Sequence, residues 1–206
     1  AEELFERARV EFRDVSPMRL AWMDFERARA FEREGDRDKA RAYLEDALEA
    51  FPEYAHAAVH AATLEPPDRA IAYLTVVEKR SDDPDVFAAL ADALRREKKD
   101  AEARAMADRA RARFEEIVAK HPRAFADHAA RFFLGEGGDV KRALALAKSA
   151  AANAPTEETL ELWLLAARAA GDSAETCAAI AAAAATTCPL RASRAEFDLA
   201  KKTCKP

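Results

Sequence analysis

Two histidines one helical turn apart are the residues of this sequence whose spacing comes nearest to a metal site. His56 and His60 stand at positions i and i+4. Zinc proteases hold their ion with this spacing and place a glutamate base directly after the first histidine. Here that position is Ala57, and the sequence indicates no third ligand. We therefore expect no metal and interpret both histidines as groove or surface residues.

Other patterns that carry catalytic chemistry are incomplete. Gly135-Glu136-Gly137-Gly138 is rich in glycine, but no strand is expected before it and no lysine followed by serine or threonine comes after it. It is therefore expected to be a turn between helices and not a phosphate-binding loop. No G-x-S-x-G motif occurs, and carboxylates along amphipathic helices usually form a solvated face. We expect no enzyme activity, no catalytic residues and no cofactor.

The three cysteines lie close to the end of the sequence, at Cys177, Cys188 and Cys204. They show no CxxC or Cys/His spacing, which argues against a zinc site. If the helix before Pro189 and the last helix form an antiparallel hairpin, residue 177 comes to face residues 202–204. This geometry predicts a disulfide between Cys177 and Cys204. The alternative is that both are small buried residues, as cysteine often is.

The elements that must position any site are helices, as the composition shows. The chain has 206 residues, a net charge of −5 and 50% hydrophobic residues; it contains 53 alanines but only 11 valines and isoleucines together. Alanine is the best helix former, whereas sheets depend on β-branched residues, so the fold is predicted to be all-α. No apolar stretch is long enough to span a membrane. The absence of a basic patch argues against a nucleic-acid partner.

Prolines and aspartates repeat in step along the chain. The prolines, separated by 35, 32, 38, 33 and 34 residues, are Pro17, Pro52, Pro84, Pro122, Pro155 and Pro189. Between them stand Asp36, Asp68, Asp100, Asp139 and Asp172. Glycine ends a helix easily, aspartate caps the next one, and proline stops a helix or begins one. Each unit is therefore predicted to be a first helix, a turn at the aspartate, and a second helix that ends near the proline.

The second helix of each unit carries a fixed spacing of x, x+4, x+7 and x+12 that ends at the proline, and its first three positions are predicted to be buried. The five sets are Ala40-Leu44-Ala47, Ala72-Val76-Lys79, Ala110-Phe114-Ile117, Ala143-Ala147-Ala150 and Cys177-Ala181-Ala184. In the third unit, ten residues separate Asp100 from Ala110 where four are usual, which predicts a second helix over about 101–120. The first helix shows its clearest pattern at Phe87-x2-Leu90-Ala91-x2-Leu94, with a second copy from Trp163 to Ala170. Its register in units 1, 2 and 4 stays open.

A period near 34 with these two helix patterns resembles the tetratricopeptide repeat (TPR) of bacterial proteins. The resemblance implies a right-handed α-solenoid of about five helix–turn–helix units with terminal capping helices. The N-terminal cap is expected to be an amphipathic helix over residues 2–15, and the C-terminal cap a helix over 191–204. The predicted divisions are 1–16 (N-terminal cap), 17–52, 53–84, 85–122 (with the extended helix), 123–155, 156–189 and 190–206 (C-terminal cap).

In this family, the first helices line a concave groove that binds a peptide or a helix of a partner. Carried onto this sequence, the groove residues are Trp22, Phe25, Arg29, Asp85, Ala88, Asp92, Arg95 or Arg96, Glu161, Leu164 and Arg168. An exposed Trp22 and Phe25 would anchor the ligand, since aromatic anchors dominate interface energies. The alternative is that both residues pack against the N-terminal helix.

The resemblance implies a scaffold or adaptor that binds a protein partner without catalysis. The alternative function is a structural module that assembles with copies of itself. A clamp for the C-terminal carboxylate of the chaperones Hsp70 or Hsp90 needs two asparagines, and this sequence has only Asn153. We expect a soluble protein and leave its compartment open between a bacterial cytoplasm and periplasm, since a chain that begins at Ala1 is either a mature form after signal removal or a trimmed piece.

Overall fold

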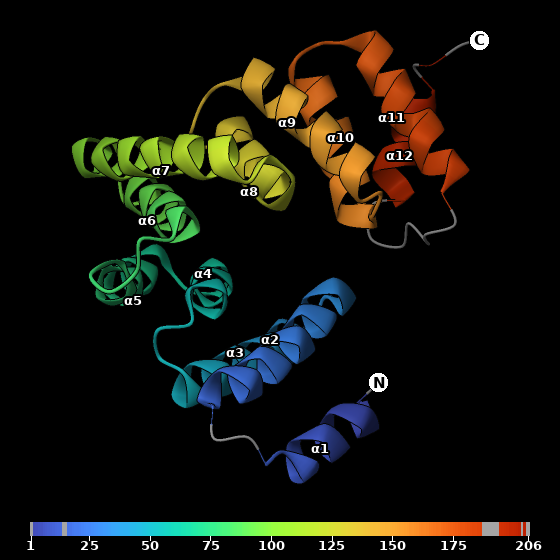
Figure 1. The fold of residues 1–206 in the computed structure, drawn as a ribbon. Helices are drawn as coiled ribbons and strands as arrows, with labels where there is room; N and C mark the ends of the chain where they lie inside the picture. The colour runs from blue at the N-terminus through green and yellow to red at the C-terminus, as the bar shows by residue number, and fades with distance from the viewer. Residues whose placement is uncertain (1, 14–15, 187–193, 203, 205–206) are drawn as a thin grey trace. The chain divides into compact units, whose positions relative to one another are not determined.

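The computed structural model describes residues 2–13, 16–186, 194–202 and 204, and every regular element in those ranges is an α-helix (Figure 1). This confirms the predicted fold class. In chain order the helices are α1 (Glu2–Glu11), α2 (Pro17–Glu34), α3 (Arg37–Ala50), α4 (Ala55–Leu64), α5 (Pro67–Glu78), α6 (Pro84–Arg96), α7 (Asp100–Lys120), α8 (Pro122–Leu134), α9 (Val140–Asn153), α10 (Glu157–Ala169), α11 (Ser173–Ala185) and α12 (Arg194–Lys201).

The helices belong to two compact units, residues 1–110 and 111–206. In the first unit α2 packs on α3, α3 on α4, and α4 on α5, while α6 contacts both α4 and α5. In the second unit α8 packs on α9, and α10 contacts α8, α9 and α11. The division lies inside α7, whose 21 residues include the extra turns expected in the third repeat. The first helix of each pair is called an A helix below, and the second a B helix.

Three aspartates begin B helices as predicted. The side chains of Asp36, Asp139 and Asp172 accept hydrogen bonds from the backbone amides of residues 39, 142 and 175. The other two aspartates do not act as N-caps. Asp68 lies in the first turn of α5 after Pro66 and Pro67, and Asp100 is the first residue of α7.

The predicted buried positions of the B helices are correct in three units and wrong in two. The sets that begin at Ala40, Ala110 and Ala143 are buried. In α5 the buried residues are Ala70, Leu74 and Val77, so the predicted set that begins at Ala72 is two residues out of register. The reason is that α5 ends at Glu78 and a longer connection leads to Pro84.

In α11 the predicted set is displaced by one residue. Thr176, Ile180 and Ala183 are buried, whereas Ala181 and Ala184 are exposed and Cys177 is half-buried. The alanine run from 181 to 185 offers an apolar residue in every register. A pattern of small residues alone therefore could not select the correct face.

The glycine-rich segment connects α8 to α9, as expected. The Gly137 amide donates to the Phe132 carbonyl at 2.7 Å, and the Arg111 guanidinium donates to the Gly137 carbonyl. A Cβ at Gly137 would lie 2.8 Å from the Phe133 Cα. Close approach of the backbone to α8 therefore requires glycine here.

The two ends of the chain are attached differently. In α12, Phe197 and Ala200 are buried in a core cluster with Leu164 and Ile180, and Cys204 forms a disulfide with Cys177. In α1 no residue is buried, and Leu4 is 67% exposed. The helix expected over residues 2–15 ends at Glu11, and Val15 lies outside the described residues. Cys188 and the turn at Pro189 also lie outside them.

The turn between α6 and α7 predicts a simple stabilising substitution. Lys98 has φ 59°, the left-handed conformation that glycine supplies at the other tight turns. Replacing Lys98 by glycine should raise the free energy of unfolding by about 0.5–1 kcal/mol, because a Cβ is unfavourable at this φ. Urea denaturation measures the change. Lys99→Gly is the matched control and should not stabilise, since Lys99 does not have a positive φ. Equal effects of both substitutions would contradict the prediction.

The disulfide predicts a specific pattern of alkylation. Unreduced, unfolded protein should take up one alkyl group, on Cys188, and reduction should add two more, on Cys177 and Cys204. Intact mass spectrometry measures both states. Because the bond closes a separation of 27 residues, reduction should also cost about 3–4 kcal/mol of stability. Three alkyl groups before reduction would show that the bond is absent.

Candidate functional site

The exposed side of α2 carries the strongest candidate for a binding surface. Met18 is 38% exposed and Trp22 is 52% exposed, and they lie one helical turn apart. At 100° per residue, Glu26 and Arg29 continue the same stripe along the helix. The core side of α2 lies about 100–120° around the helix from Trp22, where Ala21 and Ala28 are fully buried. We call the stripe of Met18, Trp22, Glu26 and Arg29 the α2 stripe; the sequence analysis missed Met18 because it matched no family position.

Phe25 does not belong to the exposed stripe. It is only 6% exposed, and its ring lies edge-on to Tyr54 at 5.3 Å and to His60 at 5.0 Å. The expectation of an exposed Phe25 anchor is therefore wrong. Its side chain instead joins α2 to α4 and supports the surface on which Trp22 stands. Burial raises the pKa of Tyr54, beside it, to about 12, so this hydroxyl stays protonated at neutral pH.

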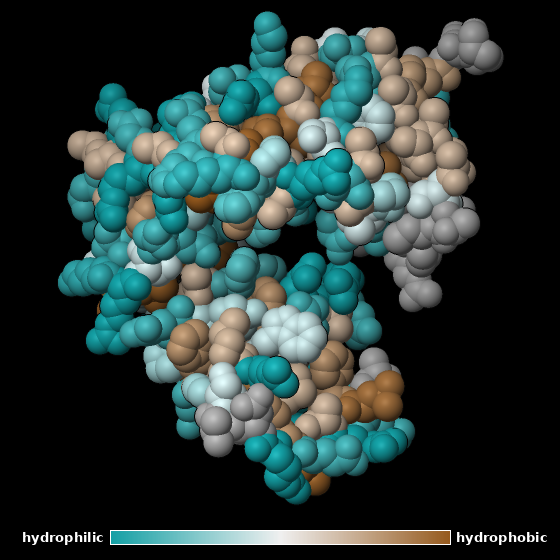
Figure 2. All heavy atoms as spheres, in the orientation of Figure 1, coloured by the Kyte–Doolittle hydropathy of each residue, from teal (hydrophilic) through white to brown (hydrophobic). Residues whose placement is uncertain are grey.

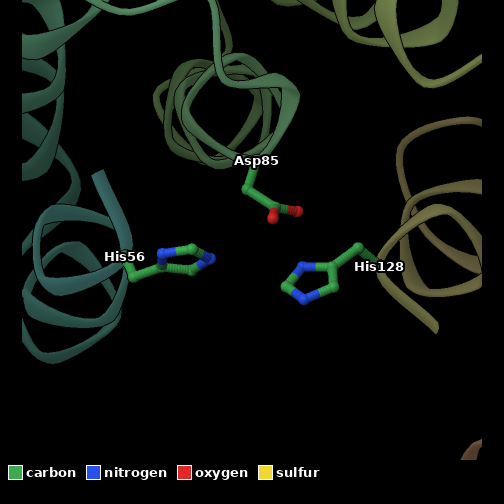
Figure 3. A group of neighbouring side chains, drawn as sticks. All are labelled: His56, Asp85 and His128. Carbon is green, nitrogen blue, oxygen red and sulfur yellow. The ribbon is translucent and has the colours of Figure 1, made fainter. Parts of the chain in front are cut away.

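The two histidines of α4 face carboxylates on the A helices at either side. His60 Nδ1 lies 2.8 Å from Glu32 Oε2 of α2. A ring nitrogen of His56 lies within 4.8 Å of a carboxylate oxygen of Asp85 of α6, and Figure 3 shows these two side chains pointing toward one another. His128, also labelled there, belongs to α8 in the second unit. In the first unit a polar contact thus joins α2 to α4, and the side chains of His56 of α4 and Asp85 of α6 lie close together.

The predicted groove residues of α6 occupy the same row of helices. Asp85 is half-buried in the first turn, where Asp83 caps the helix by accepting a hydrogen bond from the Asp85 amide at 2.9 Å. Asp92 is exposed and pairs with Arg96 at 3.0 Å, and Arg95 is exposed. These residues present charge to solvent, but with both signs.

The fifth repeat requires a correction. Leu164 is fully buried in the core of the second unit, so the expectation that it faces the groove is wrong. Leu165, its neighbour, is 38% exposed. Trp163, the first residue of the predicted pattern, is half-buried, whereas the buried residues of α10 are Thr159, Leu160, Leu162, Leu164, Ala166 and Ala167. Glu161 is half-buried and Arg168 is exposed.

Charge on the α2 stripe is balanced rather than uniform. Arg29 Nη1 lies 3.6 Å from the Glu26 carboxylate and each side chain is about one third exposed. The Arg29 guanidinium also lies 6.0 Å from the centre of the Phe25 ring. Polar and charged side chains cover much of the face seen in Figure 2, with apolar ones between them. An exposed indole beside Met18 therefore stands out as a place where apolar surface can be buried.

Comparison with known proteins identifies the fold. No family model and no curated protein sequence matches the chain. The crystal structure of TTC0263, a thermophilic TPR protein of Thermus thermophilus, superposes with a TM-score of 0.61 at 16% identity, covering 89% of this chain and 98% of that one. The fold is of the TPR type. This agreement confirms the resemblance proposed from the proline and aspartate period.

Two further solved structures are less similar. YrrB, described as a TPR protein with an unusual peptide-binding site, has a TM-score of 0.46 at 14% identity and covers 88% of this chain and 92% of its own. MamA has a TM-score of 0.40 at 15% identity over 79% of this chain and 89% of its own. In the part of this chain that the structure describes, no helix has both the length and the apolar composition needed to cross a bilayer.

The different burial of two aromatic neighbours predicts different costs of truncation. Phe25→Ala should lower the free energy of unfolding by about 3–4 kcal/mol, because it empties a buried ring position. Trp22→Ala should change it by less than about 0.5–1 kcal/mol, because half of the indole is already in water. Urea denaturation followed by circular dichroism measures both. A large loss for Trp22→Ala would show that the indole is part of the core.

Proposed function

We propose that this protein is a non-catalytic interaction module that binds a peptide or helix of a partner protein on the exposed face of α2, α4 and α6. The observation that carries the proposal is the half-exposed Trp22, with Met18 one turn away, on the A helix that begins the first unit. A tryptophan on a supported surface can bury a large apolar area at little entropic cost, which makes it a typical binding hot spot.

The polar pairs beside Trp22 suit a ligand that is partly charged. Glu26 and Arg29 offer hydrogen bonds of both kinds beside the apolar patch, as the rim of a protein interface commonly does. His60 of α4 lies 2.8 Å from Glu32 of α2, so this pair adds a polar group between the two helices. The proposed ligand is therefore an amphipathic segment with one apolar or aromatic anchor over Trp22 and Met18, and polar groups toward α4 and α6.

Peptide selection followed by measured affinity tests this proposal. A random peptide library is selected on the immobilised full chain, without depletion on any variant. Selected peptides should bind the unmodified chain at least about tenfold more tightly than Trp22→Ala, the loss expected for a hot-spot residue. Fluorescence polarisation with labelled peptide gives both dissociation constants.

The chain offers a matched control and an independent signal. Val76→Ala truncates another exposed apolar residue, 58% exposed on the B helix α5, and should leave the affinity unchanged. Trp22 and Trp163 are the two tryptophans of the sequence, so in a Trp163→Phe background peptide binding should shift the Trp22 emission to shorter wavelength. Peptides that bind Trp22→Ala as well as the unmodified chain would contradict the proposed site.

A further inference from the structure

The helix α1 contacts the first unit mainly through its charged side chains. None of its residues is buried, and Leu4 and Val10 are 67% and 70% exposed. Phe5 and Phe12 are half-buried. Packing of apolar surface holds most helices in place, so the attachment of α1 needs another source.

That source begins at Asp24, a carboxylate buried in α2. Its side chain is 1% exposed. Arg9 Nη1 of α1 donates to both Asp24 oxygens, at 2.7 and 2.6 Å, and lies 3.9 Å from Asp46 of α3. A carboxylate this buried is costly without a partner, and α1 provides the partner.

The second contact is Arg27, one turn further along α2. Its side chain is 3% exposed. Its guanidinium donates to Glu2, to Glu6 at 2.5 Å and to the Tyr43 hydroxyl at 2.7 Å, and it lies 4.0 Å from the centre of the Tyr43 ring. The Tyr43 hydroxyl in turn donates to Glu2 at 2.7 Å. We call the surface made by Asp24, Arg27 and Tyr43 the ionic face.

The ionic face fits one arrangement of charges on a helix. Glu2, Glu6 and Arg9 stand at i, i+4 and i+7, which places them on one side of α1. They face Asp24 and Arg27, which stand three residues apart on α2. Replacing Glu2, Glu6 or Arg9 by a neutral residue would take a charged partner away from Arg27 or Asp24. The ionic face is therefore specific for a helix with this pattern of charges.

α1 is nevertheless an incomplete occupant of this surface. The side of α1 that faces α2 carries the charges, while Leu4 and Ala8 remain exposed. Docking of α1 therefore gains little free energy from burial of apolar surface. A helix with the same three charges and a better placed apolar residue would bury more surface at the same site. The ionic face lies about 140–200° around α2 from Trp22 at 100° per residue, so it is separate from the α2 stripe.

We propose that the ionic face is a docking site for a partner protein's helix that carries two carboxylates and an arginine at i, i+4 and i+7, and that α1 covers this site as a displaceable occupant. Partner binding replaces α1 at Asp24 and Arg27. The site goes beyond the proposed peptide surface and does not depend on it.

A peptide with the sequence of residues 2–13, EELFERARVEFR, is the probe for the site. The host is the full chain carrying Glu6→Gln and Arg9→Gln, which weakens the attachment of its own α1 and leaves the ionic face intact. The labelled peptide should bind this host at least about tenfold more tightly than it binds the unmodified chain, because a covered site lowers apparent affinity in proportion to the uncovered fraction. Binding should weaken between about 50 mM and about 500 mM NaCl, since exposed ion pairs are screened.

Matched controls separate this interpretation from general effects. Glu3→Gln with Arg7→Gln makes the same change of charge on the exposed side of α1, where Arg7 is 72% exposed, and should not increase peptide binding. The full chain carrying Glu6→Gln and Arg9→Gln is called the opened host. A peptide with glutamine at both positions 6 and 9 should not bind it. Equal binding of the unmodified peptide to the opened host and to the unmodified chain would overturn the proposal. So would a light-scattering mass that doubles for the opened host without peptide, because the occupant would then be a second copy.

Discussion

Close approach of alanine-lined helix faces is the constraint on which the rest of this structure depends. More than half of the buried hydrophobic residues in the described part of the chain are alanines. Alanine lets two helix backbones come together but buries little area, at about 25 cal/mol per Å². A pair such as α2 and α3 therefore gains too little to be stable alone, and each pair depends on its neighbours, as in other repeat proteins. Among the large side chains that are fully buried between these alanines are Phe114, Phe133 and Leu74.

The same alanine content explains which parts of the fold the sequence could predict. Proline and aspartate have few alternatives at helix ends, so the order of helices and most turns followed directly from them. Alanine suits almost any face of a helix. The predicted buried face of α5 was therefore wrong by two residues, because the connection from α5 to Pro84 is longer than expected, and that of α11 was wrong by one. In α7 the large side chain of Phe114 distinguishes the buried face from the others, and there the predicted face is correct.

The candidate sites were predictable to different degrees for the same reason. The exposure of Trp22 could be predicted, because a large aromatic residue at a defined distance from Pro52 stands out among alanines. Phe25 was placed on the wrong side of the boundary between core and surface, since only the ring contacts with Tyr54 and His60 fix it. Leu164 and Leu165 are equivalent in composition, and the register decides which is buried. Asp24 and Arg27 look like surface charges in the sequence because their partners lie on a different helix.

The energetics of α1 show why its contacts suit exchange. One partner of each pair is partly exposed, since the side chains of Glu2, Glu6 and Arg9 are 49%, 56% and 40% exposed. In the proposed exchange, undocked α1 is the minor state that a partner selects. Acid weakens one part of this attachment. Hydrogen bonds from Arg27 and Tyr43 lower the pKa of Glu2, so its contribution to docking is present above the undocked value of 4.5 and is lost as the pH falls through the docked value. At Asp24 burial raises the pKa of the carboxyl group, while the Arg9 guanidinium of α1 lowers it. Salt weakens all of these pairs together, so ionic strength acts on the whole attachment of α1.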